Sequence, residues 1–138
     1  MKQNLEFTYP ACIYPNDDGS YTGVFPDLKG CVTQGDDLVD IIYMLKDAGC
    51  GWLLTELEEG KDVPVSSDIR KIKADEYENG FVSLIVLDVF KYSEKYGKKA
   101  VRKNCTIPYW LDLYAKENNL SLSAVLQNAL LNIYQENR

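Results

Sequence analysis

The C-terminal part of the chain is too small to enclose a hydrophobic core of its own. Residues 100–107 alternate between apolar and polar side chains, which predicts a strand, and Pro108 ends this strand at a position suited to the first turn of a helix. One short strand and two short helices cannot bury their apolar faces within a single chain. The segment therefore predicts a homodimer, in which the strand pairs with its twin as an antiparallel ribbon.

The two predicted helices are separated by a turn at Asn118 and Asn119. The first helix should begin at Pro108 and bury Leu111, Tyr114 and Ala115, with Trp110 beside them. Ser121 is a good N-cap for the second helix. That helix carries one continuous apolar stripe, formed by Leu122, Val125, Leu126, Ala129, Leu130 and Ile133.

Charge is divided unevenly along the chain. Residues 1–90 carry 17 Asp and Glu against 7 Lys and Arg, a net charge of −10. Residues 91–138 carry 4 acidic against 8 basic side chains, a net charge of +4. An acidic globular part attracts a basic partner, whereas a basic tail attracts a polyanion. The division predicts two unlike binding surfaces on one chain.

The acidic part begins with three strand signals. Residues 5–14 and 21–25 are rich in β-branched and aromatic side chains, and residues 16–19 between them are typical of a hairpin turn. Pro10 indicates an edge position or a bulge in the first strand. After a loop, residues 31–35 predict a third short strand.

A long amphipathic helix should follow, beginning at Asp36 or Asp37, whose carboxylates can cap free backbone amides. Gly60 marks its end. Gly49 and Gly51 each cost roughly 1 kcal/mol relative to alanine, which is reasonable if the helix backbone lies close against the sheet. The expected buried face consists of Leu38, Ile41, Ile42, Leu45, Ala48, Gly49, Trp52 and Leu53.

Residues 61–80 are polar and irregular, with one short helical turn at most. Residues 81–88 are the most apolar run of the chain and predict a buried, central strand. The resulting order of strand, strand, strand, helix and strand (β-β-β-α-β) predicts an α+β fold with the helix on one face of the sheet.

The composition excludes several classes of function. The chain has no histidine, which removes nucleophilic sites that use an imidazole base. Cys12, Cys31, Cys50 and Cys105 lack the short spacings of zinc sites, so we expect buried, reduced thiols, no metal and no cofactor. No apolar run approaches the ~20 residues of a membrane span, and the start lacks a signal-peptide core, so we expect a cytoplasmic protein.

One motif in the acidic part resembles a known family, the N-terminal domain of HicB antitoxins. The motif reads Tyr21-x-Gly23-x-Phe25-Pro26-Asp27-Leu28-x-Gly30-Cys31-x-Thr33-Gln34-Gly35-Asp36 and precedes the amphipathic helix. The resemblance implies a partial RNase H-like domain over residues 1–92 that binds a HicA toxin, a small basic RNase. The candidate toxin contacts are Asp17, Asp18, Tyr21, Phe25, Asp27 and Leu28. Alternatively, Phe25, Leu28 and the glycines only shape the loop and the core.

The C-terminal part resembles the ribbon-helix-helix family, because it reads Arg-x-Asn-x-Thr-Ile-Pro and continues into two helices. In that family the ribbon enters the major groove of DNA, which implies that Arg102, Asn104 and Thr106 contact base edges. The chemistry agrees, since arginine pairs with guanine and asparagine with adenine. The start of the second helix, at Ser121, Leu122 and Ser123, offers free backbone amides to a DNA phosphate.

These signals predict a HicB-like antitoxin that is not an enzyme. Residues 1–92 would neutralise an mRNA-cleaving toxin, 93–99 would form a linker, and 100–138 would form a homodimer or higher oligomer that represses its own operon through operator DNA. Two alternatives remain open: a ligand- or partner-responsive repressor without a toxin, and a metal-dependent RNase H-like nuclease using the acidic residues. Residues 99–107 could also form an edge strand of the first domain.

Overall fold

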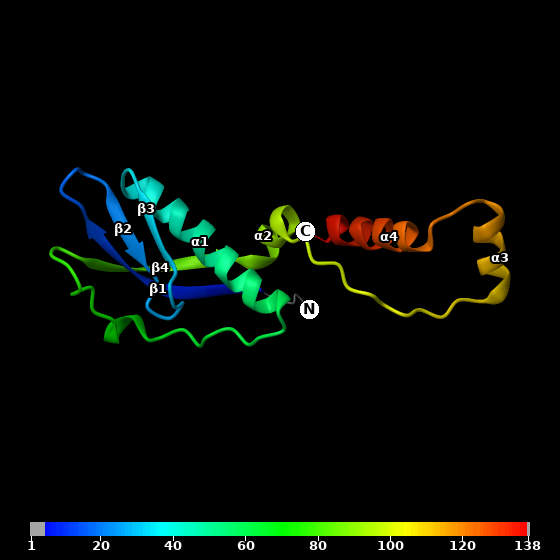
Figure 1. Cartoon of the computed structure of the whole chain (residues 1–138), viewed down its shortest axis with the longest axis horizontal. Helices are drawn as coiled ribbons and strands as arrows, with labels where there is room; N and C mark the ends of the chain where they lie inside the picture. The colour runs from blue at the N-terminus through cyan, green and yellow to red at the C-terminus, as the bar shows by residue number, and fades with distance from the viewer. Residues whose placement is uncertain (1–4, 138) are drawn as a thin grey trace. The chain divides into compact units, whose positions relative to one another are not determined.

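The computed structural model describes residues 5–137 and divides the chain into two compact units, Met1–Lys99 and Ala100–Arg138. The ends of the two predicted domains, residues 1–4 and Arg138, lie outside the described residues. The first unit combines a sheet with two helices, and the second contains two further helices (Figure 1). Each unit is described here by itself.

The first unit is built on a four-stranded antiparallel sheet in the order β3-β2-β1-β4. The strands are β1 (Glu6–Pro15), β2 (Tyr21–Val24), β3 (Val32–Gly35) and β4 (Phe81–Asp88). The α+β class and the predicted order of elements are confirmed. The predicted central position of residues 81–88 is wrong, because β4 lies at an edge and β1 is a central strand.

Pro10 lies in the middle of β1, opposite Leu84 of β4, and not at an edge or a bulge. The Val89 amide donates a hydrogen bond to the Leu5 carbonyl at the start of the β1–β4 ladder. Hydrogen-bonded pairs in an antiparallel ladder recur at every second residue, so Leu5, Phe7, Tyr9 and Ala11 form them and Pro10 does not. The ring nitrogen of Pro10 therefore faces the β2 side. Pairing with β2 begins only at Cys12, so proline removes no ladder hydrogen bond here.

Helix α1 (Leu38–Glu58) crosses one face of the sheet (Figure 1). It begins at Asp37, whose carboxylate accepts a 2.8 Å hydrogen bond from the Asp40 amide, while the Asp40 carboxylate accepts one from the Asp36 amide. Gly60, with φ +75°, follows its end. The buried positions are Ile41, Leu45, Gly49, Cys50 and Leu53. Leu38 is exposed and Trp52 only partly buried, so the buried face is narrower than predicted.

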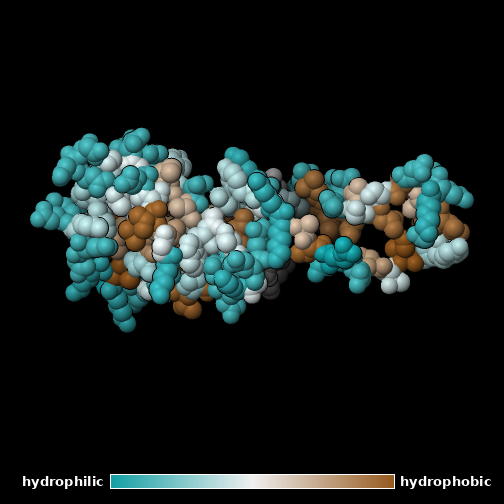
Figure 2. Space-filling view, in the orientation of Figure 1, coloured by the Kyte–Doolittle hydropathy of each residue, from teal (hydrophilic) through white to brown (hydrophobic). Residues whose placement is uncertain are grey.

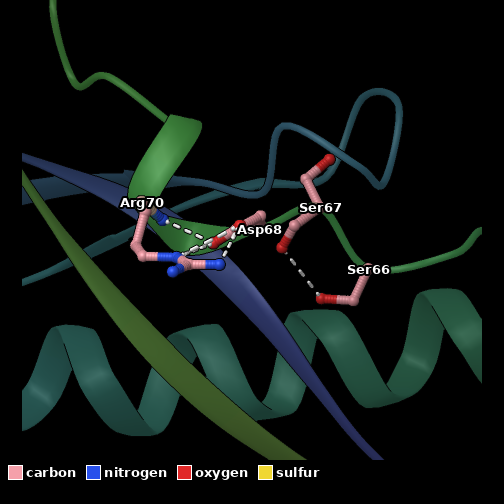
Figure 3. Close-up of polar contacts among 4 residues, drawn as sticks. All are labelled: Ser66, Ser67, Asp68 and Arg70. Carbon is pink, nitrogen blue, oxygen red and sulfur yellow. Dashed lines mark hydrogen bonds and ion pairs between the residues drawn. The ribbon is translucent and has the colours of Figure 1, made fainter.

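Residues 61–80, which we call the strap, run back along the sheet and contain a single turn of 3-10 helix, η1 (Ile69–Lys71), as predicted. Tyr9 donates a 2.5 Å hydrogen bond to the Pro64 carbonyl near its start. Near its end the Tyr14 hydroxyl accepts one from the Glu76 amide at 3.3 Å. Figure 3 shows the Asp68 carboxylate turned toward Arg70 within η1, at 2.8 Å. The hydrogen bonds of Tyr9 and Tyr14 hold the strap against β1, although the strap itself contains no strand.

Helix α2 (Val89–Tyr96) follows β4 without a break and was not predicted from the sequence. Asp88 caps it by accepting a 3.0 Å hydrogen bond from the Lys91 amide. Its only buried residue is Val89, and Tyr92 packs partly against the core of the first unit. The predicted linker at 93–99 therefore overlaps with the last residues of a helix.

The second unit contains α3 (Tyr109–Glu117) and α4 (Leu122–Glu136). Asn119, with φ +54°, makes the predicted turn, and Ser121 caps α4 by accepting a hydrogen bond from the Ala124 amide. Ala115 is the buried residue of α3; Leu111 and Tyr114, which we expected to be buried, are exposed. Residues 97–108 have no regular secondary structure in the single chain, so neither the ribbon nor an added edge strand forms here.

Candidate functional site

Asp17 and Asp18 lie in the exposed turn between β1 and β2, and Tyr21 begins β2. The Asp18 carboxylate accepts hydrogen bonds from the Ser20 hydroxyl at 2.6 Å and from the Ser20 amide at 3.0 Å. These bonds lower the pKa of Asp18 below its usual value, because they favour the charged carboxylate. The turn thus presents a fixed negative charge at the tip of the hairpin.

The loop between β2 and β3 is held by hydrogen bonds within the loop and to the strap. Phe25 and Leu28 are fully buried, and their backbones are joined by a 3.2 Å hydrogen bond from the Leu28 amide to the Phe25 carbonyl. The Asp27 carboxylate accepts hydrogen bonds from the Ser67 amide at 2.9 Å and the Ser67 hydroxyl at 2.5 Å. Burial of Phe25 and Leu28 favours a role in shaping the loop over direct contact with a partner.

The acidic residues of the first unit are spread over the surface. Asp27 binds the strap, Asp37 and Asp40 cap α1, and Asp18 holds the hairpin turn. Within residues 5–137, no three Asp, Glu or Cys side chains gather closely enough to hold a metal ion. This arrangement gives the first unit an acidic surface without a converging catalytic set.

The thiols divide into a buried and an exposed group. Burial raises the pKa of Cys31 and of Cys50 to about 11, and it also raises the pKa of Cys12. These three cysteines fill the core as small apolar side chains, as predicted. Cys105 is exposed in the single chain, contrary to the expectation of buried thiols. It lies between α2 and α3, in the segment that was predicted to form the ribbon.

The positive charge of the C-terminal half is concentrated in a short stretch. Residues 91–103 contain six Lys or Arg and one Glu, whereas residues 104–138 contain two basic and three acidic side chains. The basic region therefore consists of α2 and the residues that follow it up to Lys103. It does not include α3 or α4. The Lys99 ammonium group donates a hydrogen bond to the Glu58 carbonyl at the end of α1. The adjacent Lys98 side chain is exposed.

The side chains of Arg102, Asn104 and Thr106 are all exposed, as contact with DNA requires. Ser121 Oγ lies 3.3 Å from Ser123 Oγ at the start of α4. The first backbone bond of α4 runs from the Val125 amide to the Ser121 carbonyl, so the amides of Leu122 and Ser123 precede the helical ladder. The structure thus leaves each predicted DNA-binding group accessible.

Within residues 5–137, the apolar stripe of α4 is uncovered. Leu122, Val125, Leu126, Leu130 and Ile133 are all exposed, and Figure 2 shows apolar residues at the surface over α3 and α4. A stripe of this size in water predicts a partner surface. The sequence analysis missed a second uncovered apolar surface, Leu84 and Val86 of β4, because an unbroken apolar run was interpreted as a strand buried on both faces.

An acidic sheet unit with a basic extension and an uncovered helix pair is the arrangement of a two-part binding protein. Comparison with known proteins supplies the family. Residues 9–130 match the family model of the HicB-like antitoxin of bacterial toxin–antitoxin systems. Since the match covers most of the chain and both units, the chain belongs to the HicB-like antitoxin family.

Individual known proteins are similar to this chain. A chain of a toxin–antitoxin complex from Streptococcus pneumoniae is 26% identical, with a TM-score of 0.59 and coverage of 93% of this chain and 99% of that one. The Burkholderia pseudomallei antitoxin HicB shares the fold, with a TM-score of 0.54, 24% identity and coverage of 95% and 98%. A 14.9 kDa protein of the rep-hol intergenic region of Haemophilus phage HP1 is 32% identical over 72% of both chains.

The described helices include none that is both long and apolar enough to cross a bilayer.

Proposed function

We propose that this chain is the antitoxin of a HicA–HicB-like pair, in which its first unit neutralises a small basic mRNA-cleaving toxin and its second unit represses the operon. The main support is that the family match spans both units, residues 9–130. The similar Streptococcus chain comes from a toxin–antitoxin complex, which agrees with a protein partner. The excess of acidic side chains in residues 1–90 suits a basic one.

The second unit would act as a ribbon-helix-helix dimer on operator DNA. Two copies of residues 100–107 would pair as the ribbon and carry Arg102, Asn104 and Thr106 into the major groove. The uncovered stripe of α4 would form the dimer core, and the amides at Leu122 and Ser123 would bind a phosphate. Arg102 and Lys103 belong to this predicted ribbon segment, and Lys98 and Lys99 directly precede it in the sequence, which suits contact with the DNA backbone.

The first unit would be a partial RNase H-like domain that binds and does not cleave. Asp37 and Asp40 cap α1 and Asp27 holds the strap, and within residues 5–137 no three acidic side chains converge as two-metal catalysis requires. Asp17 and Asp18 are the predicted contacts that are exposed, while Tyr21 packs partly against the core and Asp27 is partly buried against Ser67. The cytoplasm is the expected location of such a pair.

Co-expression with the product of the neighbouring reading frame, which the proposal expects to be a small basic protein, tests the proposal. The tagged antitoxin should retain that protein through purification, and co-expression should relieve its inhibition of growth. Arg102→Ala is a matched control, because it should leave both results unchanged while weakening DNA binding. Absence of both retention and growth relief with a soluble, folded chain would contradict the proposed function.

A further inference from the structure

The outer edge of β4 is an uncovered pairing edge of the sheet. β4 pairs with β1 along its whole length from Phe81 to Asp88, and among the described residues no strand lies on its other side. Natural edge strands are usually protected by charges, proline or a bulge. Residues 81–87 contain no charged side chain and no proline. This edge therefore lacks the features that normally prevent another strand from adding to a sheet.

The hydrogen-bonding groups of this edge follow from the ladder with β1. Because Leu5 and Val89 form a hydrogen-bonded pair, residues 83, 85 and 87 direct their backbone groups toward β1. Val82, Leu84 and Val86 then direct their amides and carbonyls outward. Among the described residues, the single partner of these outward groups is the Ser83 hydroxyl, which lies 3.5 Å from the Leu84 carbonyl. Three successive outward positions are thus available to a strand.

The side chains beside this edge are also uncovered. Leu84 and Val86 are 49% and 50% exposed, on the sheet face opposite α1, whereas Ile85 and Leu87 on the α1 face are buried. The strap contacts this face at Cys12 and Tyr14 of β1, where Tyr14 meets Tyr77 edge-on at 5.3 Å between ring centroids. The turn η1 also lies near β4 and brings Arg70, which pairs with Asp68, but Leu84 and Val86 stay half exposed. The free backbone edge and the apolar side chains form one surface.

Charge decides between the possible occupants of this surface. Residues 75–88 contain four acidic and no basic side chains, and Glu6 lies directly opposite Asp88 across the β1–β4 ladder. Like charges in opposite positions repel each other. Antiparallel pairing of two β4 edges about Leu84 would bring Asp88 of each copy near Glu78 of the other, which adds further repulsion. A basic strand would neutralise these charges instead.

We infer that the outer edge of β4 receives an extended strand of the basic partner, which joins the sheet through the backbone of Val82, Leu84 and Val86. This inference rests on the proposed function and assigns its contact surface. The partner strand gains main-chain hydrogen bonds from β4 and covers Leu84 and Val86, while its basic side chains face Glu6, Glu78 and Asp88. The loop around Phe25 then stabilises the first unit but is not the main contact with the partner.

Two substitutions at Val86 separate backbone pairing from side-chain contact. Val86→Pro removes an amide that faces away from β1, so the free protein should keep its melting temperature within a few degrees. It should weaken binding of the purified basic toxin at least about tenfold, because it removes one main-chain bond and blocks the edge. Val86→Thr keeps the amide, the shape and the branching, and should bind within about threefold of the unchanged chain.

Equal binding by Val86→Pro and the unchanged chain would overturn the inference, and so would equal losses for both variants. If Val86→Pro does not fold, hydrogen exchange of the backbone amides in the unchanged full chain tests the inference instead. Saturating toxin should slow exchange at residues 82, 84 and 86, and absence of this protection would overturn the inference. Protection of these amides that rises with concentration of the chain alone would assign the edge to a second copy instead. An unchanged chain that binds no toxin at all would refute the proposed function itself.

Discussion

Gly49 and Gly51 lie two residues apart on α1 but face different neighbours. A Cβ atom on Gly49 would lie 2.7 Å from Leu87 Cδ1 in the sheet, whereas one on Gly51 would meet the end of a movable side chain, the Tyr92 hydroxyl, at 3.1 Å. The prediction that the helix lies close to the sheet is confirmed at Gly49. At Gly51 it is wrong, because that residue faces α2.

We predict that Gly49→Ala destabilises the first unit by about 1–3 kcal/mol, because overpacking of a buried contact outweighs the better helix propensity of alanine. Gly51→Ala is the matched control and should change the free energy of unfolding by less than about 1 kcal/mol. Urea unfolding followed by Trp52 fluorescence, in a Trp110→Phe background, measures both values. A cost for Gly51→Ala equal to that for Gly49→Ala would contradict this account of the contact.

Arg102 and Lys98 should make different kinds of DNA contact. Arg102→Ala should reduce discrimination between operator and scrambled DNA by roughly 1–3 kcal/mol, since a bidentate base contact is lost. Lys98→Ala should weaken binding to both DNAs alike and reduce the salt dependence by about one unit, as loss of a phosphate contact does. Gel shifts at two salt concentrations measure both effects. Equal losses on the two DNAs for Arg102→Ala would show that it contacts only the backbone.

At the scale of elements, the uncovered stripe of α4 should hold the dimer together. Leu126→Asp places a charge on the stripe and should convert the dimer to a monomer at micromolar concentration, because burying an unpaired carboxylate is costly. Gln127→Asp places the same charge beside the stripe and should leave the dimer intact. Analytical ultracentrifugation distinguishes the two states. A dimer that survives Leu126→Asp would mean that the main interface lies elsewhere.

Elements with strong local signals were predictable from the sequence. The hairpin, the Asp37 cap and the Ser121 cap depend on neighbouring residues, and the structure places them as expected. The position of β4 was not predictable, because an apolar run does not reveal how many of its sides are covered. Helix α2 was missed since it buries only Val89, and Cys105 was misplaced because it is exposed in residues 97–108, which form no regular secondary structure.

At the scale of the whole molecule, we propose that the first unit binds the toxin and the second unit binds DNA. The family match covers both units, and residues 93–99, which were predicted as a linker, belong to the first compact unit. Helix α2 ends at Tyr96, and Lys99 still contacts the end of α1. A fragment that preserves the first unit should therefore end at Lys99. It should be independent of the second unit in folding and in binding the toxin.

The most direct test of the account compares this fragment, residues 1–99, with the full chain in two assays. In cells expressing the basic toxin, the fragment should restore growth as the full chain does. In gel shifts with operator DNA the fragment should produce no complex, because it lacks Arg102, Asn104, Thr106 and the dimer core. A fragment that is folded by circular dichroism but fails to restore growth, or that shifts operator DNA as the full chain does, would contradict the division of function between the units.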